Sequence, residues 1–501
     1  MSATRLCART LAELDERVAT PRYDRSRITV GIAHFGVGGF HRAHQAMYLD
    51  TLLSQGQAFE WGICGVGVMP ADEAMCDALN SQDNLYTLIT RGGDHLPEAR
   101  VIGSLVRNLY APRDPEAVLA VLTDERTRIV SLTVTEGGYN IDAVTGEFDA
   151  ANPAIRADLE SGGSPGTIFG FVVEALRRRR LRGITPFTVM SCDNVQSNGD
   201  VARSSFAAFA ALADPDLGEW IRREVAFPNS MVDRITPATT GADITELREL
   251  FGIDDARPVV CEPFTQWVLE DSFSAGRPRW EDSGVQLTAD VEPYELMKLR
   301  LLNAGHQAIA YAGRVSGYTY AHQAASDPVF VDFLLGYMND EARPTLQPVP
   351  GIDLDEYIST LLVRFANPAI RDTIARLCAA SSDRIPKWML PVIRASLAAG
   401  RDCTRAIAVV ACWARYCEGV DEEGASIEVT DALREELMAR ARQQRAHPLA
   451  FIENERIFGD LAAQPQFAGP YQQVLASLHR VGAHRTLQDL AAALDHAPEM
   501  I

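Results

Sequence analysis

The sequence predicts two domains, an open α/β domain followed by a mostly α-helical domain. Short β-branched runs alternate with helical patterns in the first half of the chain, as in a parallel sheet with crossover helices. From about residue 293 onward the strand-like runs disappear and helical periodicity dominates. The length of 501 residues also exceeds what one ordinary hydrophobic core accommodates. We therefore expect domains at residues 1–290 and 291–501, with the boundary in the loop before Pro293.

Four apolar runs in the first domain are predicted to be parallel strands. Each run ends in glycines or polar residues, which favour turns. In an open α/β sheet, ligands bind outside the carboxyl ends of the strands, so the residues after each run are candidates for a binding site. The runs cover residues 28–35, 61–68, 129–135 and 186–192.

The first run leads into a glycine-rich turn and then a helical pattern. Gly36, Gly38 and Gly39, followed by Phe40, fit a turn in which the backbone approaches a pyrophosphate held at a helix N-terminus. His41 stands where the full fingerprint has a third glycine or an alanine. Because the turn directly follows an apolar strand, it favours a Rossmann-like domain that binds a dinucleotide.

Asp72 lies just past the second predicted strand. A carboxylate at this place accepts the hydroxyls of the adenosine ribose and repels a 2′-phosphate, which favours NAD over NADP. The alternative is that Asp72 caps a helix at residues 73–79.

The second domain is predicted to be built from helices separated by breakers such as Asn367-Pro368. These helices cover residues 329–338, 354–365, 369–380, 390–399, 404–416 and 429–442. In the first domain, the arginine run at residues 177–180 is expected to be the solvated end of a helix.

Residues 295–306 place polar groups in an otherwise apolar helical pattern. On a helical wheel of about 100° per residue, Glu295, Lys298, Asn303 and His306 fall within roughly 140° of one another. Apolar residues occupy the whole circumference, which predicts burial. Because burial lowers the pKa of a lysine, Lys298 could act as a general base. The alternative is a Glu295–Lys298 pair on a solvated strip, with His306 packed in the core.

Four further stretches are polar islands in apolar surroundings, at residues 135–140, 191–199, 227–237 and 381–387. Each alone could be a turn with local side-chain caps. Taken together they indicate a site, and Asn194 follows a predicted strand as a donor to a developing alkoxide.

The composition argues against several classes of partner. A net charge of −20 repels nucleic acid and anionic membranes, and no apolar run is long enough to span a membrane. The first residues are too charged for a signal peptide, so we expect a cytoplasmic protein. The nine cysteines lack metal-binding spacing, and His41 and His44 lack a third ligand. We therefore expect no metal, and these histidines to pack at a helix surface or between the domains.

Five motifs, in chain order and spread over nearly the whole sequence, resemble the long-chain polyol dehydrogenases, the mannitol dehydrogenase family. They are GVGGFHRAHQA, SLTVTEGGYN, SCDNVQSNG, FPNSMVDRITP and KLRLLNAGHQA. The resemblance implies a nucleotide-binding domain, a mostly helical C-terminal domain and an active site in the cleft between them. It also implies metal-independent hydride transfer between NAD and a polyol that becomes a ketose, with D-mannitol and D-fructose as the expected pair. It favours a monomer.

Carried over residue by residue, the resemblance implies that Lys298 is the catalytic base and that Asn194 and Asn303 hold the reacting oxygen. By the same resemblance His306 orients the substrate, and Glu295 gates proton exchange between Lys298 and water.

The resemblance also implies positions on the two sides of the reaction. Thr135 and Glu136 lie on the cofactor side, and Val232 and Asp233 of the family signature lie on the substrate side. Substrate-side cations are expected among Arg376, Arg384 and Lys387.

Two other enzymes remain alternatives, a hexuronate reductase such as fructuronate reductase and a pentitol enzyme such as D-arabinitol dehydrogenase. A uronate would need an extra cation facing its carboxylate, from Arg384 or Lys387. An alternative from another class is a nucleotide-binding redox sensor in which Lys298 is structural. Such a sensor does not need the set of Lys298, Asn194, Asn303 and His306.

Overall fold

The computed structural model describes residues 3–93, 96–142, 146–160 and 164–495. The chain divides into two compact units, Met1–Glu292 and Pro293–Ile501. This division lies beside the loop in which the sequence suggested a boundary.

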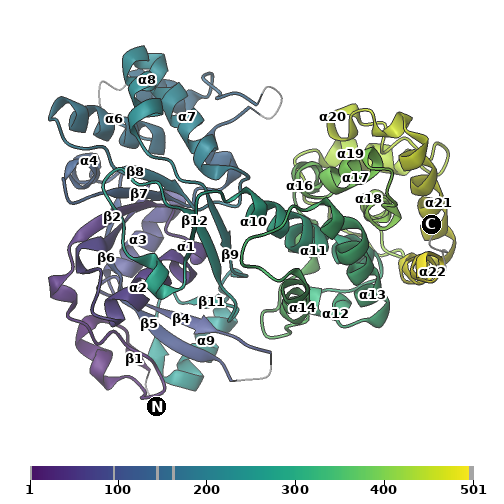
Figure 1. Cartoon of the computed structure of the whole chain (residues 1–501). Helices are drawn as coiled ribbons and strands as arrows, with labels where there is room; N and C mark the ends of the chain where they lie inside the picture. The colour runs from purple at the N-terminus through teal and green to yellow at the C-terminus, as the bar shows by residue number, and fades with distance from the viewer. Residues whose placement is uncertain (1–2, 94–95, 143–145, 161–163, 496–501) are drawn as a thin grey trace. The chain divides into compact units, whose positions relative to one another are not determined.

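A parallel sheet of five strands forms the centre of the first unit (Figure 1). Its strands lie in the order β6 (Leu105–Tyr110), β3 (Gly62–Gly67), β2 (Val30–Phe35), β7 (Ile129–Leu132) and β8 (Thr188–Ser191). All four neighbouring pairs are parallel. The four predicted strands are confirmed, and β6 was missed. The chain reverses its direction of winding between β2 and β7, which makes the carboxyl ends of these strands the switch point where ligands bind.

Both faces of this sheet are buried because successive residues of a strand point to opposite sides. On one face, Ala33 and Phe35 of β2 share a core with helices α4 (Pro115–Thr123), α6 (Ile168–Leu181) and α7 (Asn198–Ala213). On the other face, Ile32 packs in a second core with α2 (Gln45–Ser54), Trp267 and Trp280. Helices on both sides are what a parallel sheet requires.

Three smaller sheets surround the central one and were not predicted. They are β11 (Val259–Cys261) with β4 (Tyr86–Thr90) and β5 (Glu98–Ile102), β13 (Gln286–Thr288) with β12 (Gln266–Glu270) and β9 (Ser230–Asp233), and β1 (Thr4–Arg5) with β10 (Ile253–Asp254). The remaining α-helices of this unit are α1 (Gly39–Ala43), α3 (Glu73–Asn80), α5 (Pro153–Glu160), α8 (Pro215–Glu224) and α9 (Gly241–Phe251).

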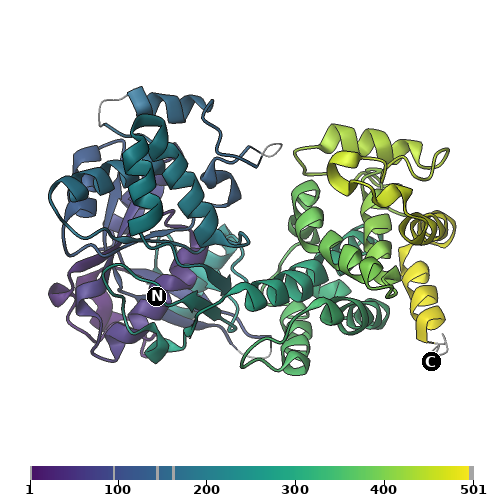
Figure 2. The ribbon, with the colours of Figure 1, turned by 45° about the horizontal axis from the view of Figure 1, so that its top comes forward.

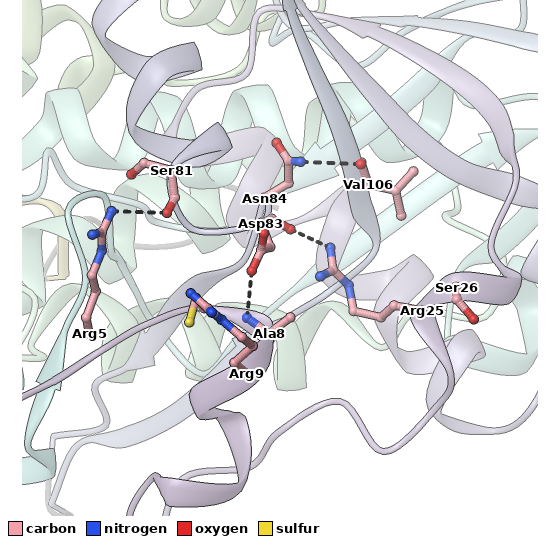
Figure 3. Close-up of a pocket in the computed structure, with 10 residues that line it drawn as sticks. Arg5, Ala8, Arg9, Arg25, Ser26, Ser81, Asp83, Asn84 and Val106 are labelled. Atoms are coloured by element: carbon pink, nitrogen blue, oxygen red, sulfur yellow. Dashed lines mark hydrogen bonds between the residues drawn. The ribbon is translucent and has the colours of Figure 1, made fainter.

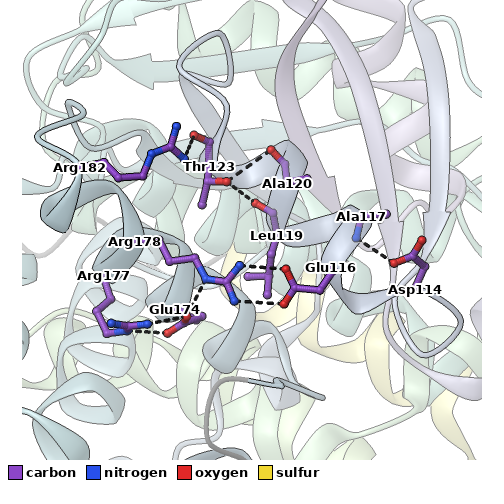
Figure 4. A network of polar contacts seen from close by, with 10 residues as sticks. All are labelled: Asp114, Glu116, Ala117, Leu119, Ala120, Thr123, Glu174, Arg177, Arg178 and Arg182. Atoms are coloured by element: carbon purple, nitrogen blue, oxygen red, sulfur yellow. Dashed lines mark hydrogen bonds and ion pairs between the residues drawn. The ribbon is translucent and has the colours of Figure 1, made fainter.

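The arginine run at the end of α6 is only partly solvated. Arg178 bridges Glu116 of α4 and Glu174 of α6, with Nη1 2.9 Å from Glu116 and Nε 2.7 Å from Glu174 (Figure 4). Arg179 is buried, and its guanidinium donates to the carbonyls of Leu122, Asp124, Thr127 and Thr185. The expectation of a solvated run was therefore wrong for Arg179, which closes the C-terminal end of α4.

The second unit is helical, and no named strand occurs among its described residues (Figure 2). Its helices are α10 (Glu292–Met297), η7 (Lys298–Asn303), α11 (Ala304–Val315), α12 (Ala321–Ala324), α13 (Pro328–Gly336), η8 (Tyr337–Ala342), α14 (Leu354–Phe365), α15 (Ile374–Cys378), α16 (Ser381–Trp388), α17 (Leu390–Ala398), α18 (Thr404–Tyr416), α19 (Arg434–Gln443), α20 (Glu455–Phe458), α21 (Pro465–Val481) and α22 (Ala483–Asp495). The buried helix α11 contacts α15 and α18 and forms the centre of this unit.

Most helices predicted in this unit are confirmed, but two predictions were wrong in extent. The helix expected at residues 369–380 is only Ile374–Cys378, because Thr373 instead forms an isolated β-bridge with Tyr320. The helix expected from residue 429 begins at Arg434. Across the described residues, no helix is long and apolar enough to cross a membrane.

Candidate active site

The glycine turn follows β2 and lies directly on the end of β7. Gly36 has φ +93°, and a Cβ at this position would lie 2.1 Å from the carbonyl oxygen of Thr133. Only glycine fits such a turn. A Cβ on Gly38 would meet nothing nearer than 3.8 Å, so the backbone is open on its other side. The turn thus has the form that lets a phosphate approach the backbone.

Side chains of β2 and of the end of β7 fix the backbone of this turn by hydrogen bonds. The carbonyl of Gly36 accepts hydrogen bonds from the Thr133 hydroxyl at 2.7 Å and from Nε2 of His34 at 3.2 Å. Because a carbonyl can only accept, Nε2 carries the proton and Nδ1 accepts from the Ser131 hydroxyl, 2.8 Å away. Burial lowers the pKa of His34 to about 3, so the ring stays neutral and keeps this arrangement at neutral pH.

His41 and His44 are buried against residues of the first unit, so the expectation of a helix-surface position was wrong. The His41 ring stacks on His34 with centroids 3.4 Å apart, and burial lowers its pKa well below the ordinary value. His44 is also buried, and its Nε2 lies 3.0 Å from the carbonyl of Gln266. Over the described residues, no three His, Cys, Asp or Glu side chains gather as a metal site would require.

Asp72 lies at the carboxyl end of β3. One of its oxygens, Oδ2, accepts the N–H groups of Val68 and Met69, both at 2.9 Å. Asp72 stands at the N-cap position of α3, as the alternative had it, but its side chain makes no capping hydrogen bond to that helix. Asp72 instead fixes the turn after the strand whose end carries the ribose carboxylate in dinucleotide-binding folds.

Two of the polar islands, residues 135–140 and 191–199, contact each other at the carboxyl ends of β7 and β8. The carboxylate of Asp193 is 7% exposed and accepts the N–H groups of Val134 at 3.1 Å and Thr135 at 2.8 Å. It also accepts the hydroxyl of Tyr139 at 2.6 Å. Thr135, Glu136 and Asn194 are exposed beside this buried contact.

A third island joins the same region through Asn198. Its amide nitrogen donates to the carbonyls of Asp193 at 3.0 Å and Ser230 at 2.7 Å, and its oxygen accepts the N–H of Ser230 at 2.9 Å. Residues far apart in sequence thus form one polar network at this edge of the sheet. The interpretation of each stretch as an isolated turn does not describe these three islands.

The signature residues after Ser230 lie on β9 and just beyond it. Val232 is buried in the second core of the unit, and Asp233 is 4% exposed. Arg234 is a structural cation, because its guanidinium donates to the carbonyls of Glu262 and Ala43.

In the second unit, the motif predicted as an α-helix contains a π-helical turn. Residues Lys298–Asn303 form η7, a π-helix between α10 and α11. The wheel of about 100° per residue was therefore wrong across this turn, since hydrogen bonds from i to i+5 bring Lys298 and Asn303 one above the other. Such turns inside α-helices occur often at functional sites.

All four polar side chains of this motif are buried. Glu295, Lys298, Asn303 and His306 are 6%, 8%, 6% and 8% exposed, so the alternative of a solvated strip was wrong. The ring of His306 stacks on Phe365 with centroids 4.0 Å apart. The side-chain oxygen of Asn303 is buried and has no hydrogen-bond partner in the part of the chain that the structure describes, although such atoms are nearly always paired.

A second π-helix, η8, packs against this motif. The Tyr337 hydroxyl of η8 donates to the carbonyl of Arg300 at 2.9 Å. A Cβ on Gly305 would lie 2.6 Å from the methyl of Met338, so the two helical segments approach closely. A side chain larger than that of glycine at position 305 would force the end of the Met338 side chain to move.

The three candidate cations of the second unit have different partners. Arg376 forms a bidentate ion pair with Asp372, at 2.6 Å and 2.5 Å. The guanidinium of Arg384 lies 5.4 Å from the ring centre of Trp388, and Lys387 pairs with Asp383 at 2.7 Å on an exposed helix face.

An arginine-lined hollow also occurs in the first unit (Figure 3). Arg25 donates to the carbonyls of Asp83 at 2.8 Å and Leu105 at 2.9 Å, and Arg5 donates to Ser81 at 3.2 Å. These contacts join chain segments near the amino ends of β2 and β6, whereas dinucleotides bind at the carboxyl ends. The hollow is therefore separate from the glycine turn.

These features define a two-domain protein of the dinucleotide-binding α/β class. Two family models cover most of the chain, "Mannitol dehydrogenase Rossmann domain" at residues 30–282 and "Mannitol dehydrogenase C-terminal domain" at residues 290–479. The chain belongs to the mannitol dehydrogenase family.

Individual relatives are similar over nearly their whole length. A mannitol 2-dehydrogenase of Phaeosphaeria nodorum is 44% identical over 97% of this chain and 86% of that protein. One from Aspergillus fumigatus is 45% identical over 94% of this chain and 95% of that protein. The solved Pseudomonas fluorescens mannitol 2-dehydrogenase, a ternary complex with NAD and D-mannitol, is 46% identical with a TM-score of 0.90, covering 99% and 100% of the two chains. A D-sorbitol dehydrogenase in substrate-free form is 37% identical with a TM-score of 0.89, covering 96% and 100%.

Proposed function

We propose that this chain is an NAD-dependent polyol dehydrogenase that oxidises D-mannitol to D-fructose reversibly and without a metal. The observation that carries the proposal is the buried π-turn that holds Lys298 and Asn303, with Glu295 and His306 beside it. It occurs in a chain that is 46% identical to a mannitol 2-dehydrogenase solved with NAD and D-mannitol.

The residues of the first unit fit NAD. A Cβ on Gly36 would collide with the chain beneath it, while Gly38 is open, as a backbone that receives a diphosphate requires. Asp72 at the end of β3 supplies a carboxylate for the ribose hydroxyls. Thr135 and Glu136 are exposed at the carboxyl end of β7 and complete the cofactor side. When bound, NAD accepts the hydride that leaves the carbinol carbon.

The chain's own residues handle the proton and the oxygen. Lys298, as the neutral amine, takes the hydroxyl proton of the alcohol. Asn194 and Asn303 donate hydrogen bonds to the oxygen, which stabilises the charge that develops on it. The amide nitrogen of Asn303 makes this donation, and its buried side-chain oxygen, which has no partner among the described residues, accepts a further hydroxyl of the bound polyol.

Other residues orient the substrate and pass on the proton. His306 is held by stacking on Phe365 and orients the substrate. Glu295, one helical turn before Lys298, exchanges the proton between the amine and water. In our proposal, the substrate hydroxyls meet the backbone at Val232, the carboxylate of Asp233 and the cations of the second unit. Each of these cations also has a partner within the second unit: Asp372 for Arg376, Asp383 for Lys387 and the ring of Trp388 for Arg384.

A panel of polyols with both cofactors tests the proposal. D-Mannitol with NAD should give the highest kcat/KM, and NADP should be a poor substitute because Asp72 would face its 2′-phosphate. EDTA should leave activity intact, whereas loss restored by zinc would contradict a metal-independent reaction.

D-Sorbitol is the second candidate substrate because of the similarity to a D-sorbitol dehydrogenase. We also propose that the protein is a cytoplasmic monomer. Light scattering coupled to gel filtration would test the monomeric state by measuring the molar mass in solution.

A further inference from the structure

The loop after β7 contains a residue in a strained backbone conformation. Thr135 has φ 65° and ψ 172°, a region that essentially only glycine occupies. A β-branched side chain at positive φ is an outlier, and such a conformation is energetically unfavourable. It persists only where the surroundings hold it, so some contact must fix this residue.

The contact that fixes it is the carboxylate of Asp193. Its Oδ1 accepts the N–H of Thr135, and its Oδ2 accepts the N–H of Val134. The Tyr139 hydroxyl donates to the same Oδ2 and lies 2.5 Å from the hydroxyl of Ser191 at the end of β8. A carboxylate is the side chain that accepts from all three donors at once, because an amide offers one oxygen and a hydroxyl offers two lone pairs.

Among the described residues, the donors to this carboxylate are all neutral. Burial raises the pKa of Asp193, while the Tyr139 hydroxyl and the N–H groups of Thr135 and Val134 oppose that shift. Burying a charge without a neighbouring cation costs free energy. A neutral side chain would close the loop at a lower cost in free energy. Asp193 also directly precedes Asn194 in the chain, so one residue links both loops at this edge of the sheet.

We propose that Asp193 is a positioning residue that locks the loop after β7 to the loop after β8. It holds Thr135 in its strained conformation and fixes the backbone from which Asn194 extends. The inference rests on the proposed function, in which Thr135 lies on the cofactor side and Asn194 holds the reacting oxygen. A displacement of about 1 Å in such groups can cost 10²-fold in rate, so the lock acts on kcat and not only on stability.

Asp255 provides a matched control in the same unit. It is fully buried, burial raises its pKa, and its carboxylate also accepts two N–H groups and one side-chain donor. These donors are the N–H groups of Thr87 at 2.6 Å and Arg257 at 2.8 Å, and the Gln82 amide at 2.9 Å. Asp255 follows β10, and none of these three donors belongs to the loops after β7 and β8.

The experiment compares Asp193→Asn with Asp255→Asn. Both variants should lower Tm, since each turns a nitrogen toward an N–H donor. Measured at a temperature where both are folded, Asp193→Asn should lower kcat for D-mannitol oxidation about 10- to 100-fold. Asp255→Asn should remain within about twofold of the wild type. Equal kcat in the two variants would overturn the inference and leave the proposed function intact, whereas a wild type that binds NADH but oxidises no polyol would refute the proposed function itself.

A rescue separates positioning from stability. Glycine adopts the backbone of Thr135 without strain, so adding Thr135→Gly to Asp193→Asn should restore at least about tenfold in kcat. If Asp193→Asn does not fold, Tyr139→Phe removes one donor to the same carboxylate and should lower kcat several-fold. An unchanged kcat in Tyr139→Phe, or a double variant no faster than Asp193→Asn, would contradict the lock.

Discussion

At the scale of single residues, Lys298 differs from almost every other cation of the chain. Lys298 and Lys387 are the only lysines among the 47 lysine and arginine residues of the sequence. Arginine serves wherever a permanent positive charge is needed, because its guanidinium does not lose its proton in proteins. An amine can be neutral when buried, so a lysine at a buried position in so arginine-rich a chain supports its assignment as the base.

Replacing Lys298 by alanine tests this assignment. Lys298→Ala should lower kcat/KM for D-mannitol by about 10²- to 10⁴-fold, the usual contribution of general-base catalysis, while NADH affinity changes little. In the wild type, activity should fall at low pH with an apparent pKa below the ~10.4 of free lysine, because burial disfavours the ammonium. A small external amine should partly restore Lys298→Ala. Near-normal turnover with an unchanged pH profile would instead point to Glu295 or His306 as the base.

At the scale of elements, sequence patterns predicted the central strands and the long helices but not the local irregularities. The runs that became β2, β3, β7 and β8 are continuous and apolar, as buried parallel strands are. Arg107 and Asn108 interrupt the run of β6, which was missed. Many of the outer strands are only two to four residues long and depend on partners distant in sequence. The π-turn was missed because we assumed an α-helical period for this motif. The apolar pattern predicts that the motif is buried, but it does not predict the π-helical geometry.

The same limits apply to the candidate site. Polar residues after predicted strands marked Asp72, Thr135 and Asn194, because the ends of parallel strands meet at one edge. Asp193 and the support of the glycine turn by His34 were missed. His34 stood inside an apolar strand, and Asp193 could not be distinguished from a turn residue without knowing that the N–H groups of Thr135 and Val134 face it.

The π-helix η8 makes a contact with the start of α18 whose energetic weight can be measured. The carboxylate of Glu341 is 2% exposed and accepts the N–H groups of Arg405 at 2.8 Å and Ala406 at 2.7 Å. Glu341→Ala would leave both buried donors unpaired, at a cost of about 1–3 kcal/mol each. We expect a Tm lower by at least several degrees, measured by calorimetry. Asp332→Ala, which removes an exposed carboxylate from the preceding helix α13, should change Tm by much less.

At the scale of the whole molecule, the chain has a net charge of −20 and many carboxylates. The dependence of its stability on pH in the acid range therefore shows which carboxylates stabilise the fold. Most ion pairs among the described residues join partly exposed side chains and contribute little each. Glu418 is different, because its side chain is 9% exposed and it joins elements that are distant in sequence. It accepts Nε2 of His479 on α21 and the amide of Gln444 beyond α19, each at 2.6 Å.

This contact predicts how stability changes with pH. Burial opposes ionisation of Glu418, but the hydrogen bonds from His479 and Gln444 outweigh it and lower its pKa. Its contribution is therefore present above the unfolded pKa of ~4.3 and is lost as the pH falls through the lower folded value. At pH 7, Glu418→Gln should be less stable than the wild type by about 1–3 kcal/mol, and the difference in Tm should shrink steadily below about pH 4. Glu435→Gln, at a side chain that is 94% exposed, should match the wild type throughout. A difference between Glu418→Gln and the wild type that stayed constant down to about pH 3 would mean that packing around Glu418, and not its ionised carboxylate, holds α21 to the rest of the helical unit.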